Sequence, residues 1–258
     1  MDIELRKPLV VGNWKMHGTL EESIRRVTAL QALTSGFSHV DIALAPPFTA
    51  LYTVSIALAE TSILLAAQNI ASEDEGPYTG EVSGVFLKEI GCKFVIVGHS
   101  ERRQHFGETD AIVNQKLQAT LRNELTPILC IGETQKEREK KQTFTVLENQ
   151  LKRAFSDIHV HDFENLVIAY EPVWAIGSGK HATPEQAEEV HHYIRNWLTK
   201  FFDGEAGRRT RILYGGSVKP SNAAALMSQS QIDGLLVGGA SLDAESFAAI
   251  AKFEEKLH

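Results

Sequence analysis

A lysine, a histidine and a glutamate, each at the end of a short apolar segment, are the residues of this chain best suited to acid–base chemistry. Lys15 ends the motif GNWK, His99 lies in GHSER and Glu171 lies in AYEPVW. If the segments are parallel strands, the three side chains meet at one end of the sheet. There a carboxylate can serve as a base, an imidazole can stabilise an oxyanion, and an ammonium group can bind an anionic substrate. This combination indicates proton abstraction beside a carbonyl group.

Two glycine-rich turns predict a phosphate site. The motifs GGS at residues 215–217 and GGAS at residues 238–241 each follow an apolar run. Glycines let backbone N–H groups approach an anion closely, and a helix that starts behind each turn adds the positive end of its dipole. By contrast, GSGK at residues 177–180 is not a nucleotide-binding P-loop, because Trp174 stands where the first glycine belongs and His181 follows the lysine.

The elements that must position these groups are short runs rich in β-branched residues, most of them followed by a segment with helical spacing. Several runs are apolar at consecutive positions, such as Phe94 to Val97, which is typical of parallel strands covered on both faces. The predicted strands cover residues 9–14, 40–45, 63–68, 94–98, 127–131, 166–171, 211–214 and 232–237.

Helix start signals separate the predicted strands. Thr19 and Glu22 have capping-box spacing, and residues 183–186 (TPEQ) repeat the pattern around a first-turn proline. Strand–helix alternation eight times over favours a closed (β/α)8 barrel, with an open doubly wound sheet as the alternative that pattern counting leaves open. We find no linker or low-complexity segment, so we predict one α/β domain over residues 1–258.

Composition and charge argue against several classes of protein. Of the 258 residues, 43% are apolar and 23% are charged, which is a globular balance. The formal net charge of −7 opposes binding to nucleic acid or to an anionic membrane. The first residues lack the apolar stretch of a secretory signal, no apolar run is long enough to span a membrane, and two cysteines provide no disulfide framework. We therefore expect a cytoplasmic protein without nucleic-acid or membrane partners.

No group of residues predicts a metal site or a second nucleophile. His191 and His192 are adjacent on a predicted helix and so point to different faces, while His159 and His161 lack companion ligands. Cys130 also ends a predicted strand, but the sequence supplies no base to activate it, so we assign it to packing.

Five longer motifs, in order along the chain, resemble the triosephosphate isomerase family. They are GNWKM, GHSERR, YEPVWAIG, YGGSV and VGGASL, which begin at residues 12, 98, 170, 214 and 237. The resemblance runs from end to end and implies a TIM barrel that interconverts dihydroxyacetone phosphate and D-glyceraldehyde 3-phosphate through an enediolate, a step of glycolysis and gluconeogenesis. It implies no cofactor and no metal ion.

The resemblance also implies a role for each matching residue. Glu171 is the base and His99 is a neutral electrophile. Lys15 attracts and orients the substrate, which Asn13 helps to position. A neutral imidazole agrees with the place of His99 before a predicted helix start, whose dipole disfavours a positive charge. The backbone N–H groups expected to bind the phosphate belong to Gly177, Ser217, Gly238 and Gly239.

Two loops resemble the family's lid and its dimer contact. The lid is expected over Pro172, Val173, Trp174, Ala175, Ile176, Ser178, Gly179 and Lys180. Its apolar first half gains burial by folding over bound substrate, and Ser178 replaces the family's usual threonine. Residues expected at the interface of a homodimer are Pro77, Tyr78 and Thr79.

Two other functions fit parts of this pattern. A barrel that only binds phosphorylated ligands would keep the glycine turns, but the joint presence of the four catalytic candidates argues against it. A Schiff-base aldolase would need a reactive lysine, and inactivation by borohydride in the presence of substrate would reveal one. The place of Glu101 stays open between the active-site hydrogen-bond network and a first-turn carboxylate stabilised by the helix dipole.

Overall fold

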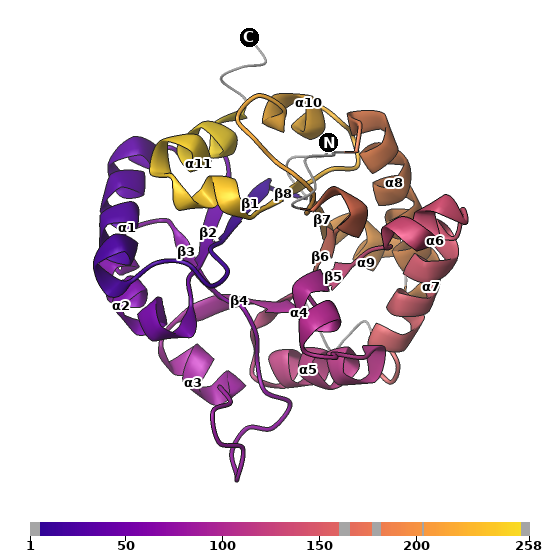
Figure 1. Ribbon diagram of the computed structural model, residues 1–258, viewed down its shortest axis with the longest axis horizontal. Helices are drawn as coiled ribbons and strands as arrows, with labels where there is room; N and C mark the ends of the chain where they lie inside the picture. Colours follow the sequence, from indigo (N-terminus) through magenta and orange to yellow (C-terminus); the bar gives the residue numbers. More distant parts are fainter. Residues whose placement is uncertain (1–5, 160–165, 177–181, 203, 254–258) are drawn as a thin grey trace.

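Eight parallel strands close into a barrel, in which β1 (Leu9–Asn13) pairs with both β2 (Asp41–Ala45) and β8 (Gly234–Val237) (Figure 1). The computed structural model describes residues 6–159, 166–176, 182–202 and 204–253. The closure confirms the predicted barrel and excludes the open sheet. The remaining strands are β3 (Leu64–Ala67), β4 (Cys92–Val97), β5 (Thr126–Ile131), β6 (Val167–Tyr170) and β7 (Arg211–Tyr214).

Helices surround the strands in a ring and follow the predicted start signals (Figure 1). The Thr19 hydroxyl accepts the Glu22 N–H while the Glu22 carboxylate accepts the Thr19 N–H, and Thr183 and Gln186 do the same. The helices are α1 (Leu20–Thr34), α2 (Phe48–Leu58), α3 (Gly84–Glu89), α4 (Ser100–His105), α5 (Asp110–Arg122), α6 (Gln135–Glu139), α7 (Thr143–Ala154), α8 (Pro184–Phe201), α9 (Gly204–Arg209), α10 (Ala223–Met227) and α11 (Ala244–Ala251). Short 3-10 turns are η2 (Val173–Ala175) and η3 (Gly239–Leu242).

The core has two layers because each strand is covered on both faces. In β4, Phe94 and Ile96 point into the barrel, whereas Val95 and Val97 pack under the helices. All four side chains are at most 1% exposed, and burying each contributes about 1.5–3 kcal/mol relative to leaving it in water. This double burial is the reason that the run is apolar at consecutive positions.

A buried ion-pair network joins the first and last strands at the end of the barrel where the strands begin. Asp233, which directly precedes β8, accepts hydrogen bonds from the Nε of Arg6 at 2.8 Å and from the guanidinium of Arg195 on α8. It also accepts the Ile212 N–H at 2.9 Å. The network therefore ties the start of β1, through Arg6, to β7, β8 and an outer helix.

One local prediction was wrong. We expected a helix to start behind both glycine turns, and the second turn does lead directly into η3. After the first turn, however, α10 begins only at Ala223, because residues 218–222 form an irregular segment in which Asn222 makes the hydrogen bonds.

Among the described residues, no helix is long and apolar enough to cross a membrane.

Candidate active site

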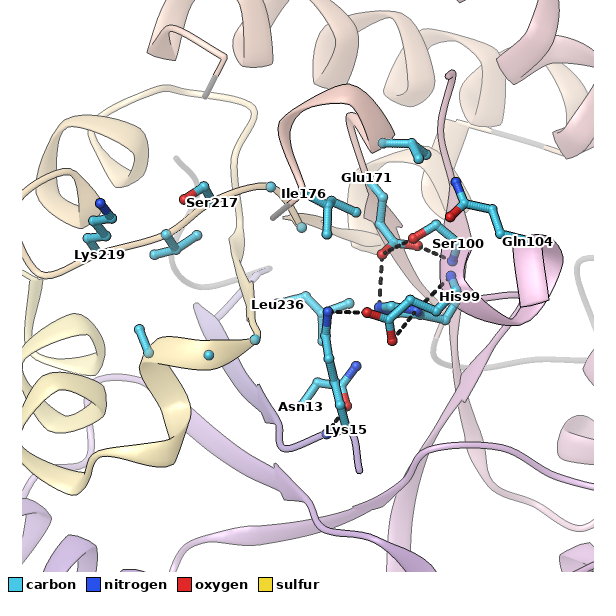
Figure 2. A pocket seen from close by; sticks show the side chains of 18 of the residues that line it. Asn13, Lys15, His99, Ser100, Gln104, Glu171, Ile176, Ser217, Lys219 and Leu236 are labelled. Atoms are coloured by element: carbon cyan, nitrogen blue, oxygen red, sulfur yellow. Dashed lines mark hydrogen bonds and ion pairs between the residues drawn. The ribbon is translucent and has the colours of Figure 1, made fainter. Parts of the chain in front are cut away.

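The four predicted catalytic residues meet in one pocket of about 520 Å³ at the carboxyl ends of the strands (Figure 2). Asn13 and Lys15 come from the end of β1, His99 from the end of β4, and Glu171 from the end of β6. The turns after β7 and β8 form the facing wall, to which the described members of the predicted phosphate site belong: Ser217, Gly238 and Gly239. Gly177 lies outside the described residues.

The carboxylate of Glu171 is almost completely buried, and three hydrogen-bond donors surround it. Its carboxylate accepts the Ser100 N–H at 2.9 Å and the Ser100 hydroxyl at 3.2 Å. The Nε2 of His99 lies 3.0 Å from Oε1, the same oxygen that accepts the Ser100 hydroxyl, while the Ser100 N–H donates to Oε2. Burial raises the pKa of Glu171, but His99 and Ser100 outweigh it and bring the pKa below its ordinary value. The carboxylate is therefore ionised and able to accept a proton.

His99 is the N-cap of α4, and its ring is fixed at both nitrogens. The Nδ1 atom accepts the Glu101 N–H at 3.2 Å, so it carries no proton, and the ring hydrogen sits on Nε2, facing Glu171. Burial lowers the pKa of His99, whereas the Glu171 carboxylate raises it, and the net direction is upward. The predicted helix start pointed only to a lowered pKa of His99, through the helix dipole, because the contact with Glu171 was not visible in the sequence. The acceptor geometry at Nδ1 favours the neutral imidazole.

Lys15 has an unusual backbone conformation that aims its side chain across the pocket. Its φ of 53° lies in the left-handed region, which is strained for a residue with a side chain. Two contacts hold it there: the Lys15 N–H donates to Asn13 Oδ1 at 3.0 Å, and the Lys15 carbonyl accepts from Gln68 Nε2 at 2.8 Å. The Lys15 ammonium pairs with Glu101 at 2.5 Å, which places Glu101 in the active-site network.

The side chains at the start of the predicted lid point in two directions, some into the pocket and some into the protein interior. Val173 and Ile176 line the pocket, as Figure 2 shows for Ile176, and Ala175 is fully buried. Trp174 turns away from the pocket, because its Nε1 donates to Glu133 at 3.0 Å and Arg138 lies 4.4 Å from its ring. Pro172 is buried ahead of them. Ser178, Gly179 and Lys180 lie outside the described residues.

Glu133 is a functional candidate that the sequence did not reveal. Its side chain is fully buried and accepts hydrogen bonds from the Tyr170 hydroxyl at 3.1 Å, Trp174 Nε1 at 3.0 Å and Arg138 at 3.0 Å. It thereby joins the ends of β5 and β6 to the first turn of the predicted lid segment. Ser100 was also missed as a ligand of Glu171, although its place beside His99 in GHSER was a usable signal.

The described residues contain no group of three His, Cys, Asp or Glu side chains that could hold a metal ion. His191 is buried and His192 exposed, so the two rings do face different ways. Cys130 is fully buried, and burial together with the nearby Glu171 carboxylate raises the pKa of its thiol well above the ordinary value. A thiol in this state is a poor nucleophile, which agrees with a packing role.

Comparisons with known proteins match this geometry. The family model for triosephosphate isomerase matches residues 8–254. The chain is 54% identical over 251 residues to a triosephosphate isomerase of Geotalea uraniireducens, covering 97% of this chain and 100% of that protein. It is 50% identical, with the same coverage, to one from Endomicrobium trichonymphae. A crystal structure of triosephosphate isomerase from Bartonella henselae superimposes with a TM-score of 0.87 at 40% identity, covering 96% of this chain and 99% of that one. The chain belongs to the triosephosphate isomerase family.

Proposed function

We propose that this enzyme interconverts dihydroxyacetone phosphate and D-glyceraldehyde 3-phosphate with Glu171 as the base, His99 as the electrophile and Lys15 as the cation that orients the substrate. The observation that carries these roles is that an ionised, buried carboxylate, an imidazole N–H and an ammonium group line one pocket. The glycine turns after β7 and β8 form the wall opposite, where the substrate phosphate binds through backbone N–H groups, including those of Ser217, Gly238 and Gly239.

In the first step, Glu171 exchanges its hydrogen bonds to Ser100 and His99 for the substrate and removes a proton from the carbon beside the carbonyl. The Nε2–H of His99 is then free to donate to the carbonyl oxygen, where negative charge develops. The Lys15 ammonium group lines the same pocket and helps to stabilise that negative charge. A proton then moves from the terminal hydroxyl of the substrate to the former carbonyl oxygen beside His99. Glu171 finally returns its proton to the carbon that carried the carbonyl, and the enediolate becomes the aldehyde. Each step uses a side chain of this chain, so the proposal includes no cofactor.

The alternative, a barrel that binds phosphorylated ligands without catalysis, is not favoured. Such a protein would need the phosphate turns alone, whereas this pocket also holds a base that three donors keep ionised. Replacing Glu171 by Gln tests the assignment, because the amide keeps the shape but cannot accept the proton. We expect turnover to fall at least ~10²-fold while the affinity for inorganic phosphate is kept. Near-normal turnover in a coupled isomerase assay would rule out Glu171 as the base.

We also propose that residues 172–180 act as a lid. Support comes from Val173 and Ile176, two apolar side chains that already border the pocket next to Glu171. Folding the rest of the segment over the substrate removes water from the carboxylate and strengthens its interaction with the reacting carbon.

The assembly and location proposed for this enzyme are a homodimer in the cytoplasm, built from one domain per chain. In Figure 1 the loop between β3 and α3 projects from the ring of helices. It exposes Pro77, Tyr78 and Thr79, and Met16, next to the catalytic lysine, is 92% exposed. A second copy that covers these side chains would bury apolar surface beside the active site. The cytoplasmic location rests on the glycolytic role of the family.

A further inference from the structure

The charges that line the pocket mouth are almost balanced, which matters for a substrate that is a phosphate dianion. Apart from histidines, the ionisable side chains lining the pocket are Lys15, Lys219, Glu101 and Glu171. The two lysines offset the two glutamates, and without Lys219 the lining would carry one excess negative charge. The whole chain, at −7, adds a field that also repels anions.

The two lysines differ in what surrounds them. The Lys15 ammonium is held 2.5 Å from the Glu101 carboxylate, so most of its charge is offset before substrate arrives. Lys219 is exposed, and among the described residues it makes no ion pair. Its charge therefore reaches into the solvent at the mouth with little compensation, screened only by salt.

The backbone of Lys219 is fixed beside the turn that faces the substrate phosphate. Asn222 accepts the Lys219 N–H through its Oδ1 at 2.8 Å, and its Nδ2 donates to the Ser217 carbonyl at 3.0 Å. One side chain thus locks both ends of the segment from Ser217 to Lys219. Figure 2 shows Lys219 on the Ser217 side of the pocket, away from Lys15. The cation therefore lies on the side of the pocket formed by the glycine turn after β7.

We infer that Lys219 is a capture residue, which attracts the phosphate of the substrate to the pocket before Lys15 and the backbone N–H groups bind it. This role rests on the proposed isomerase function and adds a residue to it. Lys219 acts on the encounter, not on the reacting atoms. Its loss should therefore lower kcat/KM and leave kcat unchanged, and the effect should disappear as salt screens the charge.

The test compares Lys219→Met with a charge-matched control, Lys93→Met. Lys93 is also exposed, but it lies near the start of β4, at the opposite end of the barrel. At ~10 mM ionic strength we expect Lys219→Met to lower kcat/KM roughly 3- to 10-fold and to weaken competitive inhibition by inorganic phosphate. At ~0.5 M salt the difference from the unsubstituted enzyme should shrink to less than about 2-fold. Lys219→Arg should keep kcat/KM, and Lys93→Met should change it little at any salt concentration.

The outcomes separate this inference from the function on which it rests. An unsubstituted enzyme that fails to isomerise either triose phosphate contradicts the function itself. If that enzyme is active, three results overturn the role of Lys219: an unchanged kcat/KM in Lys219→Met, a loss that persists at high salt, or an equal loss in Lys93→Met. A fall in kcat with unchanged kcat/KM also contradicts capture, because it would place the effect after binding.

Discussion

The proton affinity of Glu171 depends on the donors around its carboxylate. Burial alone would raise its pKa, and the contacts with His99 and Ser100 bring it below 4.5. A group whose pKa is lower in the folded state stabilises the fold at pH values above about 4.5, and this contribution is lost as the pH falls through the folded value. The same shift keeps the base active at mildly acidic pH.

Replacing Ser100 by Ala removes one of these donors, the hydroxyl 3.2 Å from Glu171 Oε1, and leaves the Ser100 N–H in place. We expect the pKa of Glu171 to rise, so the acidic limb of the pH profile of kcat/KM should move to higher pH. Ser100→Thr keeps a hydroxyl and serves as the control. An unmoved limb in the alanine variant would show that the hydroxyl does not set the proton affinity of the base.

Gly132 makes room for the backbone of Glu171. A Cβ atom at this position would lie 1.7 Å from the Glu171 carbonyl oxygen, so the end of β6 would have to move. We expect Gly132→Ala to reduce kcat at least ~10-fold, because displacing a base by about 1 Å can reduce the rate ~10²-fold. Gly204→Ala is the matched control, since no heavy atom lies within 4 Å of the added carbon. Equal activity of the two variants, measured beside thermal unfolding, would contradict this role for Gly132.

The residues that line the candidate site could be proposed one by one from the sequence, but their contacts with one another could not. Lys15, His99 and Glu171 stand out because each ends an apolar run. The ligand set of Glu171 needs distances between residues 71 positions apart, as in the contact with Ser100. The raised pKa of His99 has the same origin, since it comes from a carboxylate on another strand. Periodicity and capping signals carry no information about such contacts.

Among the elements, strand positions were predictable because double burial leaves runs of apolar residues, as in β4. The irregular segment before α10 was not, because the hydrogen bonds of Asn222 replace the helix start that the glycine turn suggested. Nor could the sequence show that Trp174 faces Glu133 and not the pocket. A lone apolar residue in a loop can turn either way, and here a buried carboxylate decides the direction.

The lid prediction concerns the fate of the enediolate, which expels its phosphate when the leaving group rotates into line with the π system. Deleting residues 175–178 and rejoining the loop should leave Glu171, His99 and Lys15 in place, so deprotonation continues. Without the lid, water reaches the intermediate and the phosphate is no longer held in plane. We expect methylglyoxal and free phosphate as a substantial share of product, where the intact enzyme makes almost none. The measurement is phosphate release beside isomerised product, and a proportional fall in both would mean that the segment is only a connection.

For the whole molecule, the predicted homodimer is open to a direct test. Thr79 is exposed in the projecting loop next to Tyr78, which is 49% exposed. An arginine at this position would place a positive charge in the dimer interface, where it would be buried without a partner. Thr79→Arg should shift the protein from dimer to monomer at micromolar concentration in sedimentation and lower its activity. A monomeric unsubstituted enzyme would contradict the homodimer, and Glu73→Gln, at an exposed position nearby, controls for a change in charge alone.

The pairing of β1 with β8, sealed by Arg6 and Asp233 at a separation of 227 positions, also bears on the chain while it is being synthesised. The first strand leaves the ribosome long before its second neighbour exists, and until residues 234–237 are translated its free edge offers unpaired N–H and C=O groups. Strands that are apolar on both faces make such an edge prone to join another nascent chain. We therefore expect the incomplete chain to aggregate more readily than the closed barrel until β8 is available to pair with β1.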